Sequence, residues 1–309
     1  MNSLAVESHG VRLQAYTLGD SSQPPVVLVH GYPDNHSVWL PVAERLAQRY
    51  FVILYDVRGA GASDAPANTA DYRMAQLSAD LEAVVDAIIP GREFHLAGHD
   101  WGSIQSWESV TAGPLTTRIR SYTSLSGPCL DHMGYWMRDR APNQPGQVLK
   151  QALSSWYIGF FHLPVLAPLA WAGGLDRLWP SYLKHREGVE EASPNPTQRR
   201  DGKNGVQLYR ANFRHKLLRP EQRPAHCPVQ LIVPTGDNYV GTQLFEDLHL
   251  WVSELYRRDI DATHWVLLSQ PDTLAEWIGQ FVDGVENGRM PEALAQARIN
   301  PITMGDTQP

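Results

Sequence analysis

Short, continuous apolar runs recur along the chain and alternate with segments of helical spacing. The runs lie at 25–29, 51–55, 94–97, 119–125, 229–233 and 255–260. Runs of this length are typical of parallel strands that are buried on both faces. A half-exposed strand is predicted at 11–16, and helices are predicted at 72–89, from about Ser103 and at 273–285. This alternation predicts an α/β fold with a mostly parallel sheet flanked by helices.

The stretch 129–225 interrupts the alternation, because it is rich in aromatic residues and prolines and has no clear strand pattern. We expect it to form an inserted helical cap over the carboxyl ends of the strands, where open α/β sheets bind their ligands. Residues 1–128 and 226–285 then form the core. The polar residues 286–309 are expected to be a loosely held C-terminal tail.

Composition narrows the class of protein. The 309 residues are 43% hydrophobic, enough for a large core, and the net charge of −7 argues against nucleic acid as a partner. With only two cysteines, Cys129 and Cys227, reduced thiols are favoured over a disulfide framework. Residues 1–7 lack the basic start and long apolar stretch of a secretory signal. We therefore expect a cytoplasmic protein, and a homodimer is left open.

One segment is apolar enough to suggest a membrane span. Residues 151–175 contain no Asp, Glu, Lys or Arg. Pro164 and Pro168 interrupt the segment, and proline breaks the hydrogen bonding of a helix. The sequence therefore predicts short aromatic-rich helices that line a pocket, and no stable membrane insertion. Loose contact with a membrane is the alternative.

Asp100 is the residue that points most directly to chemistry. Residues 94–103 read FHLAGHDWGS, so that Gly98 and Gly102 flank Asp100 at the spacing of a nucleophile elbow. A carboxylate that attacks a saturated carbon leaves an alkyl ester, which water can cleave, whereas a serine would leave an inert ether. Asp100 therefore predicts an epoxide or alkyl halide substrate and a covalent intermediate. The alternative is an ordinary turn with a surface aspartate.

Two further residues complete a catalytic set. Asp237 follows the predicted strand at 229–233, and His264 follows the one at 255–260. The order nucleophile, acid, histidine is that of the α/β-hydrolase triad. His264 would activate water, Asp237 would orient the imidazole, and the backbone N–H groups of Tyr32 and Trp101 would form an oxyanion hole.

The chain resembles the epoxide hydrolases of the α/β-hydrolase fold over about 11–285. The resemblance rests on His30-Gly31-Tyr32-Pro33, Asp56-x-Arg58-Gly59-x-Gly61-x-Ser63, Gly98-His99-Asp100-Trp101-Gly102, Asp237 and His264. Haloalkane dehalogenases share most of these residues but usually carry Asn where this chain has Tyr32.

The resemblance implies two cap tyrosines that hold the epoxide oxygen and protonate it. Tyr157 matches the first, in a Tyr-x-x-x-Phe-x-x-Pro pattern, and Tyr209 matches the second, in Tyr-Arg-x-Asn. A phenol stays protonated at neutral pH and can donate to a developing alkoxide. Core packing is the alternative role. The family's usual Gln-Glu is replaced by His162-Leu163, which bears on substrate preference.

The expected activity is conversion of an apolar epoxide to a vicinal diol through an alkyl ester on Asp100, with neither metal nor organic cofactor. Cap aromatics suggest an apolar pocket: Trp136, Trp156, Phe160, Phe161, Trp171, Trp179 and Phe213. Among them Trp156, Phe160 and Phe161 are expected to bind substrate. A haloalkane dehalogenase and a catalytically silent binding subunit are the alternatives. The stretch from Met290 resembles the linker of bacterial proteins in which such a hydrolase is fused to a short-chain dehydrogenase.

Overall fold

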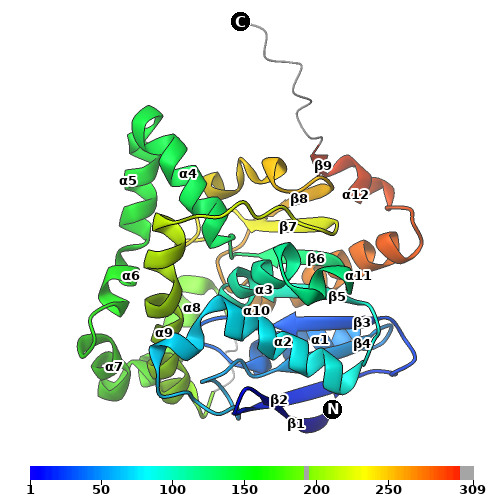
Figure 1. Ribbon diagram of the computed structural model, residues 1–309, viewed down its shortest axis with the longest axis horizontal. Helices are drawn as coiled ribbons and strands as arrows, with labels where there is room; N and C mark the ends of the chain where they lie inside the picture. Colours follow the sequence, from blue (N-terminus) through cyan, green and yellow to red (C-terminus); the bar gives the residue numbers. More distant parts are fainter. Residues whose placement is uncertain (191–194, 300–309) are drawn as a thin grey trace, which may run out of the picture.

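The computed structural model describes residues 1–190 and 195–299, and within them one sheet organises the molecule (Figure 1). The strand order is β1-β2-β4-β3-β5-β6-β7-β8-β9. The strands are β1 (Asn2–Ser8), β2 (Val11–Leu18), β3 (Pro25–Val29), β4 (Phe51–Tyr55), β5 (Phe94–His99), β6 (Ile119–Leu125), β7 (Val229–Pro234), β8 (Leu255–Ile260) and β9 (Arg298–Ile299). The strands from β4 to β8 in this order are parallel, whereas β1, β2 and β9 pair antiparallel at the edges.

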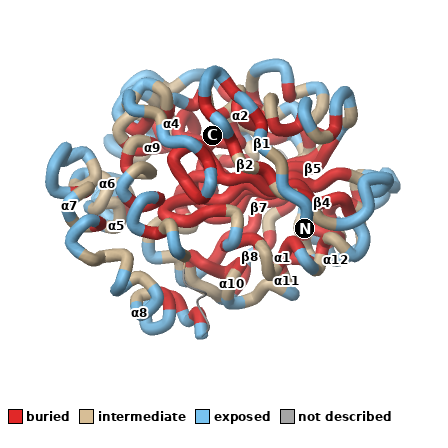
Figure 2. Tube along the Cα trace, turned by 90° about the horizontal axis from the view of Figure 1, so that it is seen from below, coloured by how far each residue is buried: buried red, intermediate tan, exposed pale blue. Residues whose placement is uncertain are grey.

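Helices cover both faces of the sheet, as the sequence predicts. Since successive side chains of a strand point to opposite faces, β3 contributes to two cores. Val27 and Val29 pack with α2 (Met74–Ile88) and α3 (Trp101–Thr111). Val26 and Leu28 pack with α1 (Leu40–Leu46) and α11 (Pro271–Glu286). Figure 2 shows the central strands buried between these layers, and the predicted α/β architecture is confirmed.

The described part of the chain between β6 and β7 contains helices joined by loops, and no strand. Its helices are α4 (Leu130–Asn143), α5 (Pro145–Ser154), α6 (Trp156–Phe161), α7 (Leu166–Ala170), α8 (Asp176–Glu187) and α9 (Gln198–Leu218). They lie together at one end of the sheet, with α5, α6 and α7 outermost (Figures 1 and 2). Across residues 1–190 and 195–299, no helix has both the length and the apolar character that a membrane crossing requires.

The two ends of the chain differ from the sequence expectation. The edge strand β1 is not predicted, because its alternation is weak. The expected loose tail is partly ordered: α12 (Glu292–Gln296) buries Leu294 against Tyr256 and Phe281, and β9 pairs with β8. This pairing covers part of an otherwise open sheet edge. Residues 300–309 of the predicted tail lie outside the described residues.

Candidate active site

Asp100 stands on a tight turn between β5 and α3. Its backbone has φ 51° and ψ −123°, a conformation that costs a non-glycine residue about 1–3 kcal/mol. Glycines make the turn sterically possible: a Cβ on Gly98 would lie 2.5 Å from the Gly102 carbonyl oxygen, and one on Gly102 would collide with the Val29 carbonyl. The strained turn presents the carboxylate at the end of the sheet, where it is 8% exposed.

One carboxylate oxygen of Asp100 already has a backbone donor. The Tyr32 N–H donates to Asp100 Oδ1 at 2.7 Å. Gly31 permits this approach, because a Cβ on it would overlap the Asp100 side chain. Trp101, the first residue of α3, directly follows the nucleophile position, and the contribution of its N–H to an oxyanion hole stays a prediction.

The structure brings Asp237 and His264 to the same sheet end as Asp100. His264 Nδ1 lies 2.8 Å from Asp237 Oδ2, and His264 Nε2 lies 3.5 Å from Asp100 Oδ2. Asp237 Oδ1 accepts from the N–H groups of Tyr239 at 2.8 Å and Val240 at 3.0 Å. These bonds fix the Asp237 carboxylate, which leaves Oδ2 to hold the imidazole.

Burial and charge have opposite effects on the pKa values of His264 and Asp237. Burial disfavours the imidazolium, but the charge of Asp237 and the hydrogen bond to Asp100 outweigh it and raise the pKa of His264 well above its ordinary value. Burial likewise disfavours the Asp237 carboxylate, yet the charge of His264 lowers the pKa of Asp237 below its ordinary value.

The two predicted cap tyrosines face Asp100 from different helices. Tyr157 belongs to α6 and Tyr209 to α9, and their ring centroids are 6.1 Å apart. Together with Asp100 they line one pocket, to which Phe213 and Tyr239 also contribute. Burial, followed by the charge of Asp100, raises the pKa of both phenols well above 10. Both phenols are therefore proton donors throughout the neutral range.

None of the three predicted substrate-binding aromatics lines the pocket that holds Asp100 and the two cap tyrosines. Phe161 packs against Tyr209, with ring centroids 4.8 Å apart, and Phe160 contacts Phe161 at 6.0 Å. Trp156, in contrast, is 69% exposed. The reason is helical spacing: positions 157 and 161 share the inner face of α6, which places Trp156 outside.

Arg210 holds the two tyrosine-bearing helices together. Its Nε donates to the Phe161 carbonyl at 2.7 Å and its Nη2 to the Leu163 carbonyl at 2.8 Å. Phe161 is the last residue of α6 and Leu163 lies two residues beyond it, where carbonyl groups have no intrahelical partner. A rigid guanidinium fork on α9 thereby sets the position of α6, and hence of Tyr157.

Sequence reasoning missed two acidic residues beside His264. The Trp265 Nε1–H donates to Asp34 Oδ2 at 2.8 Å, and burial raises the pKa of Asp34 to about 7. Asp34 could have been identified from the sequence, because it directly follows the His-Gly-Tyr-Pro motif. Glu187, on cap helix α8, accepts from the His264 N–H at 3.1 Å. No local pattern marks Glu187, because this contact joins segments far apart in the sequence.

In the described residues, the His, Cys, Asp and Glu side chains form no group of three that could hold a metal ion. Cys129 and Cys227 are buried free thiols.

Comparison with known proteins agrees with this geometry. A family profile described as "alpha/beta hydrolase fold" matches residues 24–271. "Probable oxidoreductase EphD" of Mycobacterium tuberculosis is 33% identical over 97% of this chain, which spans 52% of that protein. The chain thus spans about half the length of the EphD relatives that it matches. "Epoxide hydrolase 4" of Mus musculus is 31% identical over 90% of this chain and 78% of its own length.

Solved structures give the same fold. An epoxide hydrolase from Bacillus megaterium, in complex with its naphthyloxy-propanediol product, superposes with a TM-score of 0.75 at 19% identity, covering 91% of this chain and 100% of its own. Epoxide hydrolase A from Mycobacterium thermoresistibile gives a TM-score of 0.70 at 22% identity, covering 92% of this chain and 98% of its own. The elbow, the sheet order and these matches confirm the predicted fold and resemblance: the chain belongs to the α/β-hydrolase fold family.

Proposed function

We propose that the protein is an epoxide hydrolase that converts an apolar epoxide to a vicinal diol. The observation that carries the proposal is the pair of phenols, Tyr157 and Tyr209, which line one pocket together with the carboxylate of Asp100. Ring opening of an epoxide needs a nucleophile on one side of the carbon–oxygen bond and a proton donor on the other. The pocket offers both.

In the first step Asp100 Oδ2 attacks an epoxide carbon, and the bond between that carbon and the ring oxygen breaks. Oδ2 is the attacking atom because the Tyr32 N–H holds Oδ1. Tyr157 and Tyr209 donate hydrogen bonds to the ring oxygen, and one of them transfers its proton as the alkoxide forms. The product is an alkyl ester that carries the first hydroxyl of the diol.

In the second step water attacks Cγ of the ester. Alkylation removes the negative charge of Asp100, so the hydrogen bond and the charge of Asp100 no longer raise the pKa of His264. His264 Nε2 can then accept the proton of the water, while Asp237 stabilises the imidazolium. The oxyanion on Oδ1 is held by the Tyr32 N–H, with that of Trp101 as the proposed second donor. Collapse cleaves the bond between Cγ and Oδ2, and the His264 imidazolium gives the departing oxygen its proton, which releases the diol. The remaining proton of the former water returns to the phenolate, which restores both the Asp100 carboxylate and the tyrosine.

The two phenols favour epoxide hydrolysis over dehalogenation. A departing halide leaves as an anion and needs no proton, whereas an alkoxide does. Tyr32 also occupies the position where haloalkane dehalogenases usually carry Asn. A silent binding subunit would have no use for the fixed contacts among Asp100, Asp237 and His264.

Substrate class and location follow from the surroundings of the pocket. Ile104, Met133 and Phe213 line it beside the phenols, which favours an apolar epoxide over a small polar one. The two free thiols, Cys129 and Cys227, support a reducing, cytoplasmic location. The net charge of −7 gives no support for a nucleic acid partner.

Trapping the ester tests the proposal. His264→Gln protein mixed with a panel of apolar epoxides should gain the mass of one epoxide, mapped to Asp100, because the ester forms but is not hydrolysed. Asp100→Asn is the matched control and should gain no mass. Adducts with alkyl halides alone would establish the dehalogenase alternative, and no adduct with either class, despite bound ligand, would establish the silent binder.

Replacing the phenols tests the origin of the proton. Tyr157→Phe and Tyr209→Phe should each slow adduct formation in the His264→Gln background, and the double variant by about 10²–10⁴-fold. Unchanged adduct formation in the double variant would contradict the role given to both residues.

A further inference from the structure

The outer edge of the cap exposes a dense set of large apolar side chains. Eight of them lie between positions 149 and 178 and are 44–69% exposed: Leu149, Leu153, Trp156, Leu163, Val165, Leu166, Leu169 and Leu178. We call this set the cap apolar surface. It belongs to α5, α6, α7, α8 and the connection between α6 and α7, and both views place α5, α6 and α7 along one edge of the molecule (Figures 1 and 2).

The helices that carry the cap apolar surface have apolar side chains on both their outer and their inner sides. Leu149, Leu153 and Trp156 follow one another at helical spacing on the outside, whereas Tyr157 and Phe161 face inward. The inner side is therefore occupied by the candidate active site, and the outer side meets solvent. Exposed apolar patches rimmed by polar residues mark surfaces that a partner or a membrane covers.

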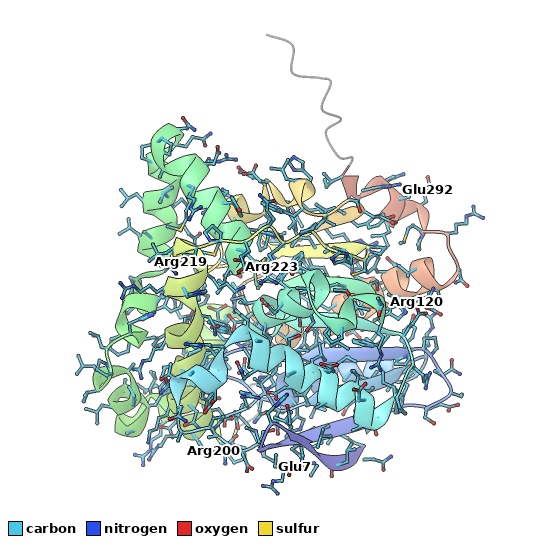
Figure 3. All side chains as sticks on the ribbon, viewed as in Figure 1. Glu7, Arg120, Arg200, Arg219, Arg223 and Glu292 are labelled. Atoms are coloured by element: carbon cyan, nitrogen blue, oxygen red, sulfur yellow. The ribbon has the colours of Figure 1, made fainter. Side chains whose placement is uncertain are left out.

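The charge of the cap differs in sign from the rest of the chain. Residues 129–225 contain 14 Lys and Arg against 8 Asp and Glu, a net charge of +6, while the remaining residues contain 12 against 25, a net charge of −13. All four lysines of the chain lie in the cap. Figure 3 labels three of its basic residues, Arg200, Arg219 and Arg223, and three charged residues outside it, Glu7, Arg120 and Glu292.

Several basic side chains border the cap apolar surface. Lys150 precedes the charge-free segment 151–175 and Arg177 follows it, both exposed. Lys184 and Arg186 are exposed on the last turn of α8. In the described parts of the chain, none of these four side chains forms an ion pair with an acidic residue. Their charge is therefore available to an anionic surface.

We propose that the cap apolar surface docks on an anionic lipid bilayer, with its leucines and Trp156 in the interfacial region and the bordering Lys and Arg on the headgroups. Amphipathic surface helices bind membranes through this combination of apolar burial and attraction to anionic lipid. The helices lie in the interface, in keeping with the lack of a spanning helix in the described residues. A symmetric dimer through this surface is less favourable, because it would bring two caps of charge +6 together.

Vesicle flotation tests the proposal with the intact chain. Vesicles of equal parts phosphatidylcholine and phosphatidylglycerol should carry the protein, and those of phosphatidylcholine alone, or high salt, should carry much less. Leu153→Ser and Leu166→Ser should each weaken partitioning by about tenfold. Leu250→Ser, on an equally exposed leucine outside the cap, is the matched control. Arg177→Glu should weaken binding more than Arg289→Glu, which changes the net charge equally but lies outside the cap.

The outcomes separate this inference from its rivals. Loss of flotation in the cap variants only, with unchanged thermal unfolding, supports it. No flotation of the wild type at low salt, or equal loss in the control variants, overturns it. A wild-type dimer that the serine variants convert to monomer, without vesicle binding, also overturns it and assigns the surface to a second copy. Because flotation needs no turnover, failure of the proposed hydrolase activity would leave this result intact.

Discussion

Tyr32→Phe is expected to lower the free energy of unfolding by about 2–4 kcal/mol, although it removes a single oxygen atom. The Tyr32 hydroxyl joins the core to the cap. It accepts from the Trp171 Nε1–H at 2.7 Å and donates to the Gly202 carbonyl at 3.1 Å. Tyr32 and Trp171 are 8% and 1% exposed, so water does not readily replace the lost partner.

The size of this loss in unfolding free energy depends on which hydrogen-bonding groups the substitution leaves without a partner. The Trp171 N–H becomes an unsatisfied buried donor, at a cost of about 1–3 kcal/mol, and the bond to Gly202 contributes about 1 kcal/mol more. Ring packing against Phe161 and Tyr209 is retained, since phenylalanine keeps the aromatic ring. The backbone N–H that holds Asp100 Oδ1 is also unchanged.

Urea unfolding of the two proteins measures the difference, with Tyr55→Phe as the matched control. Tyr55 is 1% exposed, and its hydroxyl has no hydrogen-bond partner among the described residues, so its loss should cost less than about 1 kcal/mol. Equal destabilisation by Tyr32→Phe and Tyr55→Phe would refute the role of the Tyr32 hydroxyl as a link between core and cap.

Other expectations follow from the same contacts. Asp237→Asn should slow ester hydrolysis by about 10⁴-fold, with the alkyl-enzyme accumulating in rapid-quench mass spectra; unchanged turnover would contradict its role. The folded state raises the pKa of His264, so its pairing contributes stability that is complete below about pH 6.5 and is lost as the pH rises through the folded pKa. The difference in unfolding free energy between wild type and His264→Gln should therefore shrink at alkaline pH, and a constant difference would argue against the pair. Gly31→Ala should slow ester formation by at least about 10²-fold, because its Cβ overlaps Asp100; normal kinetics would show that the backbone can yield. Arg210→Lys should slow ester formation more than it destabilises the fold, because a point charge cannot hold both carbonyls at the end of α6.

Local pattern was enough for the core of the fold and for the residues that follow its strands. The apolar runs became β3, β4, β5, β6, β7 and β8, because strands buried on both faces leave a continuous signal. Asp100, Asp237 and His264 could be predicted from their places after strands, since parallel strands end at one edge of the sheet.

Contacts between distant segments could not be predicted in this way. The bond from the His264 N–H to Glu187 joins the cap to the core, and nothing near either residue in the sequence announces it. The residues of α6 that line the pocket could not be predicted, because α6 is apolar on both faces and hydrophobicity alone does not say which face is inside. The C-terminal pairing of β9 depends on an edge that exists only once the sheet has formed.

The unequal surroundings of the two Asp100 oxygens have a consequence for isotopes. Oδ1 is held by the Tyr32 N–H, whereas Oδ2 faces His264. If Oδ2 leaves with each diol and a solvent oxygen replaces it, turnover in heavy-oxygen water labels the protein before it labels the product. The oxygen held by Tyr32 would stay with the enzyme through successive turnovers. A second heavy oxygen would enter Asp100 only after the carboxylate has rotated and exchanged the positions of Oδ1 and Oδ2. The rate at which the second label appears would therefore measure this rotation, which does not affect the rate of diol formation.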